Sequence, residues 1–135
     1  MQMTEAKHGR ATSEMEAVAK VEGKPVDSIL RKLATGKLVI PHNVNRENIE
    51  VKGIGEGLCT KVNANIGTSP DYANVEEEVE KAKVAVKYGA DTVMDLSIGG
   101  DIDEVRRRIL KAVPVPVGTV PIYQAGIGAV SRGDV

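Results

Sequence analysis

The sequence contains a single cysteine, Cys59, among its 135 residues. One thiol cannot form a disulfide within the chain, which argues against the disulfide-built folds of small secreted proteins. No apolar run approaches the roughly 18 residues needed to span a bilayer. Residues 1–8 also lack the hydrophobic core of a signal peptide. We therefore expect a cytoplasmic protein with no membrane partner.

The sequence also has no Phe and no Trp, and only three Tyr. With 41% hydrophobic residues, its core must be built from Val, Ile, Leu, Ala and Met. The net charge of −1 comes from interspersed basic and acidic residues and gives no reason to expect nucleic-acid binding. The basic run 106–108 follows Asp103 and Glu104, so charge pairs on a solvated helix face are expected rather than a phosphate patch.

The most informative segment that is present runs from Lys61 to Asp71. Apolar residues at 62, 64 and 66 alternate with Asn63 and Asn65, the period-2 pattern of a strand. Asn is a poor strand former, and its amide both donates and accepts hydrogen bonds. Two such residues at a strand end suit recognition of a polar ligand. The alternative, that both amides only cap neighbouring loops, remains open at this point.

Two further strands and two helices follow. We expect parallel strands at about 61–66, 91–96 and 117–122, joined by helices at about 74–88 and 101–112. Asn74 is the expected N-cap of the first helix and Gly89 its C-terminal stop. The order β-α-β-α-β predicts an α/β fold with both helices on one side of the sheet.

Three side chains recur at matched positions near the strand ends. Asn65, Met94 and Tyr123 are 29 residues apart in turn. Parallel strands joined by helical crossovers would bring all three to one rim of the sheet. We therefore expect them to lie within reach of one small ligand.

The segment before these strands has a different pattern. A capping box, Ser13 to Glu16, predicts a helix that ends near Gly23, with Met15, Val18 and Val21 on its apolar face. A second helix is expected from Pro25 to Gly36, and a short strand at 38–40. We divide the chain into a helical N-terminal segment 1–50, a partial barrel 51–125 and a tail 126–135.

Two glycine-rich segments have the composition of anion sites. The segment 53–57 is the weaker candidate because no helix N-terminus follows it. The segment 97–101 joins a strand to a helix, whose free N–H groups attract anions. Asp101 would repel a phosphate there, and it is equally expected as the N-cap of that helix.

Several long runs resemble one enzyme family. They are 61–71, 89–97 and 114–125, with 36–45 and 53–58 upstream, and the likeness extends from Met3 to Ala125. The chain resembles the phosphomethylpyrimidine synthases, radical S-adenosylmethionine enzymes that make the pyrimidine half of thiamine. The resemblance implies a (β/α)8 TIM barrel that converts aminoimidazole ribonucleotide to hydroxymethylpyrimidine phosphate. It also implies S-adenosylmethionine, a [4Fe–4S] cluster on three C-terminal cysteines and a possible zinc.

The resemblance carries substrate-binding roles onto particular residues. Asn65, Met94 and Tyr123 match substrate-binding positions of the family. The tail triplet Ser131, Arg132 and Gly133 matches a further one only if the tail is homologous. That triplet follows a later strand in the family, so the tail resembles an internal join or a rebuilt terminus, with a chance triplet as the rival explanation.

The departures from the family limit what this chain can do alone. Cys59 is one thiolate where the cluster needs several. His8 and His42 lie outside the matched strands and are expected to be solvated, so we assign no catalytic and no metal-binding residue. A barrel of this type takes about 250 residues, so three strands would leave open edges that invite association, and we expect a homo-oligomer. The chain is therefore either part of a longer synthase or a non-catalytic nucleotide-binding or assembly remnant of the family.

Overall fold

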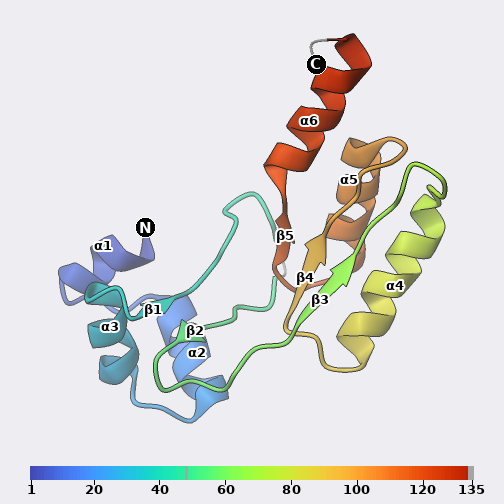
Figure 1. Cartoon of the computed structure of the whole chain (residues 1–135). Helices are drawn as coiled ribbons and strands as arrows, with labels where there is room; N and C mark the ends of the chain where they lie inside the picture. The colour runs from blue at the N-terminus through green and yellow to red at the C-terminus, as the bar shows by residue number, and fades with distance from the viewer. Residues whose placement is uncertain (48, 134–135) are drawn as a thin grey trace. The chain divides into compact units, whose positions relative to one another are not determined.

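The computed structural model describes residues 1–47 and 49–133 (Figure 1). The chain divides into two compact units, Met1–Lys61 and Val62–Val135. This division falls later in the sequence than the boundary predicted at residue 50. Each unit has its own hydrophobic core and is described by itself.

The first unit consists of three helices and a two-stranded antiparallel sheet. The helices are α1 (Gln2–Lys7), α2 (Ser13–Glu22) and α3 (Val26–Ala34), and the strands are β1 (Leu38–Val39) and β2 (Ile54–Gly55). Both helices predicted between residues 13 and 36 are present. The helix α1 was not predicted from the sequence.

The start of α2 and one of its apolar positions differ from the prediction. Thr12, not Ser13, is the N-cap, and its side chain accepts a hydrogen bond from the backbone N of Met15 (3.3 Å). Val21 is 76% exposed, so it does not belong to the buried face. The core of this unit is formed by Ala6, Met15, Val18, Ala19, Ile29, Leu33, Leu38 and Ile40.

The second unit has the predicted parallel sheet. Its elements in chain order are β3 (Asn63–Ile66), α4 (Val75–Lys87), β4 (Thr92–Asp95), α5 (Ile102–Ala112), β5 (Val117–Thr119) and α6 (Pro121–Arg132). The strands lie in the order β3-β4-β5, and both pairings are parallel. The prediction that the first and third strands form the edges of this sheet is confirmed.

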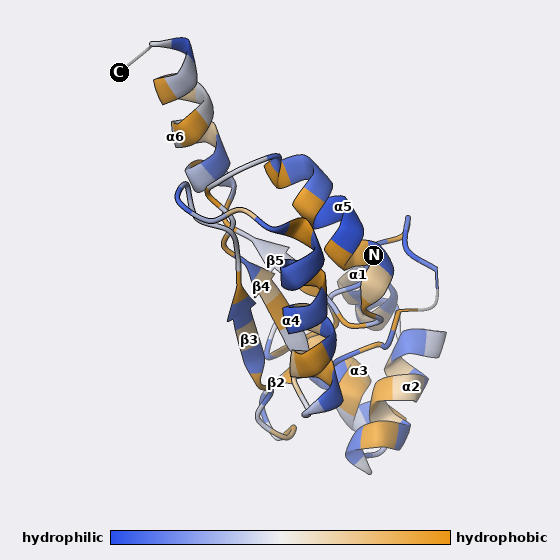
Figure 2. Cartoon of the chain, turned by 90° about the vertical axis from the view of Figure 1, so that its right-hand side faces the viewer, coloured by the Kyte–Doolittle hydropathy of each residue, from blue (hydrophilic) through white to orange (hydrophobic). Residues whose placement is uncertain are grey.

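The helices α4 and α5 lie side by side on one face of this sheet (Figure 1). Asn74 and Asp101 are their N-caps, because each side chain accepts a hydrogen bond from a backbone N three residues later. Figure 2 colours both helices partly hydrophilic and partly hydrophobic, as expected for helices that cover a sheet. The core between the layers contains Ile66, Val79, Ala82, Val93, Val105, Ile109, Val113 and Val115.

The third strand is shorter than predicted. The expected strand 117–122 ends at Thr119, and Pro121 begins α6 instead. Pro is favoured at the first position of a helix because its fixed φ fits and its missing N–H is not needed there. The helix α6 continues without a break across the predicted boundary between residues 125 and 126, and none of its described residues is buried.

Among the described residues, no helix combines the length and the apolar character that crossing a membrane requires.

Candidate functional site

The sheet face opposite α4 and α5 carries the first two predicted site residues. Asn65 of β3 and Met94 of β4 are register partners, so their side chains project from the same face. The alternate residues Ile66 and Val93 are buried against the helices. Asn65 is exposed and Met94 is half-buried. The structure therefore brings Asn65 and Met94 together on the sheet face opposite α4 and α5.

The polar side chains on this face bond to one another. The Nδ2 of Asn63 donates to the Oδ1 of Asn65 (3.3 Å), and the Oγ1 of Thr92 donates to the Oδ1 of Asn63 (2.7 Å). These bonds run along the sheet and not to loop backbones. Within the described residues, the loop-capping alternative therefore has no support from the side chains of Asn63 and Asn65.

The side chain of Met94 extends over the neighbouring strand. Its register partner in β5 is Gly118. A Cβ added at Gly118 would lie 3.0 Å from both the Sδ and the Cε of Met94. The thioether therefore occupies space that a side chain at 118 would need, and its polarizable sulfur lies on the open face of the sheet.

Tyr123 does not lie on this sheet. It belongs to the first turn of α6, and its exposed fraction is 48%. The 29-residue spacing does not mark an equivalent position in the third strand, because the residue of β5 beside Met94 is Gly118 and not Tyr123. No hydrogen bond described for the chain joins Tyr123 to Asn65 or Met94, and the binding of all three to one ligand stays a prediction.

The tail residues lie at the far end of α6, which runs away from the sheet in Figures 1 and 2. The Oγ of Ser131 donates to the backbone O of Gly128 (2.9 Å). Gly133 is the C-cap of α6 and has the left-handed φ of 73°. The structure thus separates Ser131, Arg132 and Gly133 from the face that carries Asn65.

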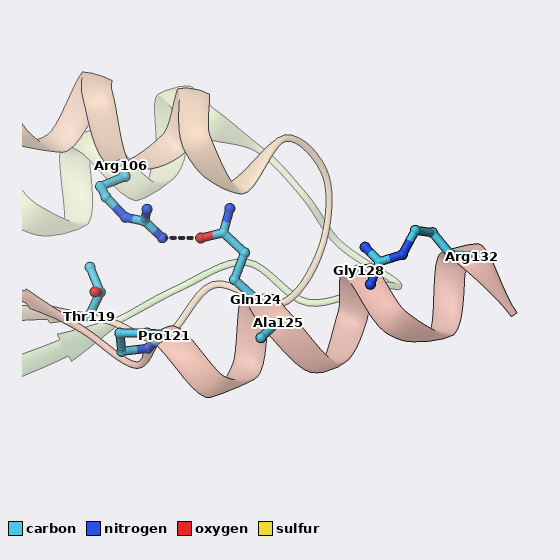
Figure 3. A pocket seen from close by; sticks show the side chains of 7 residues that line it. All are labelled: Arg106, Thr119, Pro121, Gln124, Ala125, Gly128 and Arg132. Carbon is cyan, nitrogen blue, oxygen red and sulfur yellow. Dashed lines mark hydrogen bonds between the residues drawn. The ribbon is translucent and has the colours of Figure 1, made fainter. Parts of the chain in front are cut away.

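Arg132 lines a cavity of about 440 Å³ between α5 and α6 (Figure 3). Arg106 on the opposite wall donates through Nη2 to the Oε1 of Gln124 (2.7 Å) and lies 3.3 Å from Asp103. Gln124 in turn donates to Asp103 (3.0 Å). The predicted charge pairs of α5 are therefore present, and Arg107 pairs with Glu104 in the same way (3.2 Å).

The end of β4 and the loops that follow β3 and β4 contain buried polar residues to which the sequence analysis gave no individual role. Thr68, Ser97 and Asp95 are 3%, 5% and 3% exposed. They lie at the carboxyl ends of parallel strands, where α/β proteins bind their ligands. The carboxylate of Asp101 caps α5 by accepting from the N of Glu104 (2.9 Å), which supports the N-cap interpretation of the segment 97–101 over an anion site.

His8, His42 and Cys59 all lie in the first unit. The Nδ1 of His42 lies 3.0 Å from the Oε1 of Glu14. Hydrogen bonds, first among them that with Gln2, lower the pKa of Glu14 to about 2. Cys59 is exposed, and its backbone N donates to Glu22 (2.9 Å). In the part of the chain that the structure describes, no group of three His, Cys, Asp or Glu residues could hold a metal ion.

Comparisons with known proteins agree on one family. The profile of the Radical SAM ThiC family matches residues 1–134. The phosphomethylpyrimidine synthase of Pyrococcus furiosus is 58% identical over 132 residues, which cover 98% of this chain and 31% of that protein. A phosphomethylpyrimidine synthase of Thermus thermophilus is 55% identical over 132 residues, which cover 97% of this chain and 30% of that protein. The chain thus spans about three tenths of the length of these relatives.

Proposed function

Because this chain belongs to the Radical SAM ThiC family, we propose that it is the N-terminal part of a phosphomethylpyrimidine synthase. The complete enzyme would be a cytoplasmic radical lyase of thiamine biosynthesis. It would convert aminoimidazole ribonucleotide to hydroxymethylpyrimidine phosphate with S-adenosylmethionine and a [4Fe–4S] cluster. The observation that carries this proposal is the 58% sequence identity with the Pyrococcus furiosus enzyme over 98% of this chain.

The three parallel strands of the second unit would be the first strands of a (β/α)8 barrel. In such a barrel the helices lie outside and the opposite sheet face points to the interior. The position of Asn65 and Met94 on the sheet face opposite α4 and α5 is consistent with that arrangement. The remaining strands would come from sequence that the relatives have beyond the matched segment.

The residues of this chain do not fit the iron–sulfur cluster. Such a cluster is held by several Cys thiolates, and the sequence offers only Cys59. We therefore assign no step of the radical chemistry to this chain. Its contribution would be to hold the substrate.

The proposed binding roles follow from side-chain chemistry. The amide of Asn65 would hydrogen-bond the ribose or the imidazole, and the sulfur of Met94 would pack on the ring. Tyr123 would supply a phenolic donor, and Arg132 would pair with the phosphate. For Tyr123 and Arg132 this requires α6 to lie closer to the sheet in the complete enzyme.

The test is a full-length chimera in which this chain replaces the matched segment of the Pyrococcus furiosus relative. The chimera should bind aminoimidazole ribonucleotide and form product. Asn65→Ala should raise the Kd about 5- to 150-fold, because a polar group of the ligand loses its partner. Asn63→Ala is the comparison variant: Asn63 lies two residues earlier on the same face and bonds both Thr92 and Asn65, so its loss should raise the Kd less than Asn65→Ala does.

Two results would contradict this proposal. Unchanged affinity of the Asn65→Ala chimera with a lowered melting temperature would show that Asn65 is structural. A chimera that binds the nucleotide but forms no product would favour the second candidate, a non-catalytic nucleotide-binding remnant of the family.

A further inference from the structure

Two buried hydroxyl groups tie together the loops that follow β3 and β4. The backbone N of Thr68 donates to the Oγ of Ser97 (3.1 Å), and the Oγ1 of Thr68 donates to the backbone O of Gly99 (2.6 Å). The backbone N of Ile98 completes the link by donating to the O of Thr68 (3.0 Å). The two loops are therefore joined by three hydrogen bonds beyond the last ladder bonds of the sheet.

The link is anchored on a buried carboxylate. Both the N and the Oγ of Ser97 donate to the Oδ1 of Asp95 (3.0 and 2.5 Å). The Oδ2 of Asp95 is buried and has no hydrogen-bond partner among the described residues. Burying an incompletely satisfied carboxylate costs free energy that an apolar residue would not cost. The polar network of Thr68, Ser97 and Asp95 therefore serves to fix one geometry of the two loops and not only to stabilise the fold.

The backbones of the two loops are also in direct contact. A Cβ added at Gly67 would lie 2.7 Å from the C of Leu96 and from the N of Ser97. Gly67 also has a φ of 150°, which disfavours other residues. Its backbone N donates to the Oε2 of Glu78, a carboxylate that is 2% exposed (2.7 Å). The loop after β3 is therefore fixed by contacts with the loop after β4 and with α4.

We propose that Thr68 and Ser97 are positioning residues that fix the ends of β3 and β4 for ligand binding. Asn65 lies three residues before Thr68, and Met94 lies three before Ser97. The hydroxyl link keeps these two strand ends in one register, so the amide and the thioether meet the ligand as one preorganised surface. This inference rests on the proposed function, because the ligand is aminoimidazole ribonucleotide.

Thr68 provides a matched pair of variants. Thr68→Val keeps the shape and removes the hydroxyl bond to Gly99, whereas Thr68→Ser keeps the hydroxyl. In the full-length chimera, Thr68→Val should raise the Kd for aminoimidazole ribonucleotide about tenfold, the equivalent of one lost hydrogen bond. Thr68→Ser should stay within about twofold. Val105→Ala lowers stability from a buried position on α5, outside the loops, and should leave the Kd unchanged.

Coupling to Asn65 separates positioning from a general loss of stability. If Thr68 acts by placing the end of β3, the effects of Thr68→Val and Asn65→Ala on the Kd will be less than additive. In the 135-residue chain itself, hydrogen exchange at the amide of Ile98 should speed up in Thr68→Val. Ser97→Ala tests the same link from the other loop if Thr68→Val folds poorly.

The possible results have distinct meanings. An unmodified chimera that binds no nucleotide overturns the proposed function. A chimera that binds normally, with Thr68→Val and Ser97→Ala both without effect on the Kd, overturns the positioning role alone. Equal losses of affinity in Thr68→Val and Val105→Ala would also overturn it, because stability would then explain both.

Discussion

Glu78 provides the sharpest test of how the second unit is held together. Its carboxylate is 2% exposed and accepts a hydrogen bond from the N of Gly67 (2.7 Å), while Lys81 forms an ion pair with its other oxygen. Glu78→Ala removes a hydrogen bond to a charged acceptor, a loss of about 1.5–3 kcal/mol. The pair with Lys81, which is 44% exposed, adds at most about 1 kcal/mol.

Relief of the buried charge and the better helix propensity of Ala offset part of this loss. We therefore expect Glu78→Ala to lower the free energy of unfolding by about 2 kcal/mol. For a unit of this size, that corresponds to a fall in melting temperature of about 8–16 °C. Urea unfolding followed by circular dichroism gives the free energy, and a thermal scan gives the melting temperature.

Two further variants identify the cause. Glu80 lies on the same helix and pairs with Lys83 (2.6 Å), but both side chains are at least half exposed. Glu80→Ala should therefore cost less than about 0.5 kcal/mol. Glu78→Gln keeps an oxygen that can accept from Gly67 and should recover most of the loss. Equal effects of Glu78→Ala and Glu80→Ala would refute the role of the hydrogen bond to Gly67.

Three further expectations follow from other sites. The pKa of Glu14 is lowered from 4.5 to about 2, chiefly by its hydrogen bond with Gln2. Ionised Glu14 therefore contributes fully to the free energy of unfolding above pH 4.5, and this contribution is lost as the pH falls toward 2. Urea unfolding across that range should show a free energy of unfolding that declines less in Glu14→Gln than in the unmodified chain. Identical declines in the two proteins would contradict this. Gly99→Ala places a Cβ 2.1 Å from a backbone oxygen and should lower stability by about 1–3 kcal/mol in thermal scans, whereas Gly126→Ala, which meets nothing within 4 Å, should not. Anaerobic addition of iron and sulfide to the isolated chain should give no [4Fe–4S] absorption, because Cys59 is one thiolate; a stoichiometric cluster in the monomer would contradict this.

The sequence predicted the elements whose local signals agree with their packing. Asn74 and Asp101 are good N-caps, apolar residues follow them at helical spacing, and both helices begin where expected. Alternation around Asn65 predicted the end of β3 at Ile66 and put Asn65 on the polar face, although the strand begins at Asn63, two residues later than predicted. These predictions succeeded because capping and periodicity act over a few residues, which a single sequence displays in full.

The predicted end of the third strand was wrong for a local reason that the sequence also contains. The apolar run 117–122 has the composition of a strand, but it includes Pro121. Pro has no N–H for a sheet ladder and favours the first turn of a helix. Giving Pro121 more weight than the apolar run would have ended the strand at Thr119, and Tyr123 would then have been placed in the following helix.

Two buried carboxylates, Glu78 of α4 and Asp95 of β4, show what periodicity can still reveal. Glu78 lies three residues after Val75 and four before Ala82, so it falls on the apolar stripe of α4 and not on the solvated face. Asp95 lies two residues after the buried Val93, on the face of β4 that packs against the helices. A carboxylate at a position that the pattern marks as buried must find donors nearby. The sequence could therefore have singled out both residues, but not the hydrogen bond from the N of Gly67 to Glu78, because that contact depends on how the loop after β3 packs against α4.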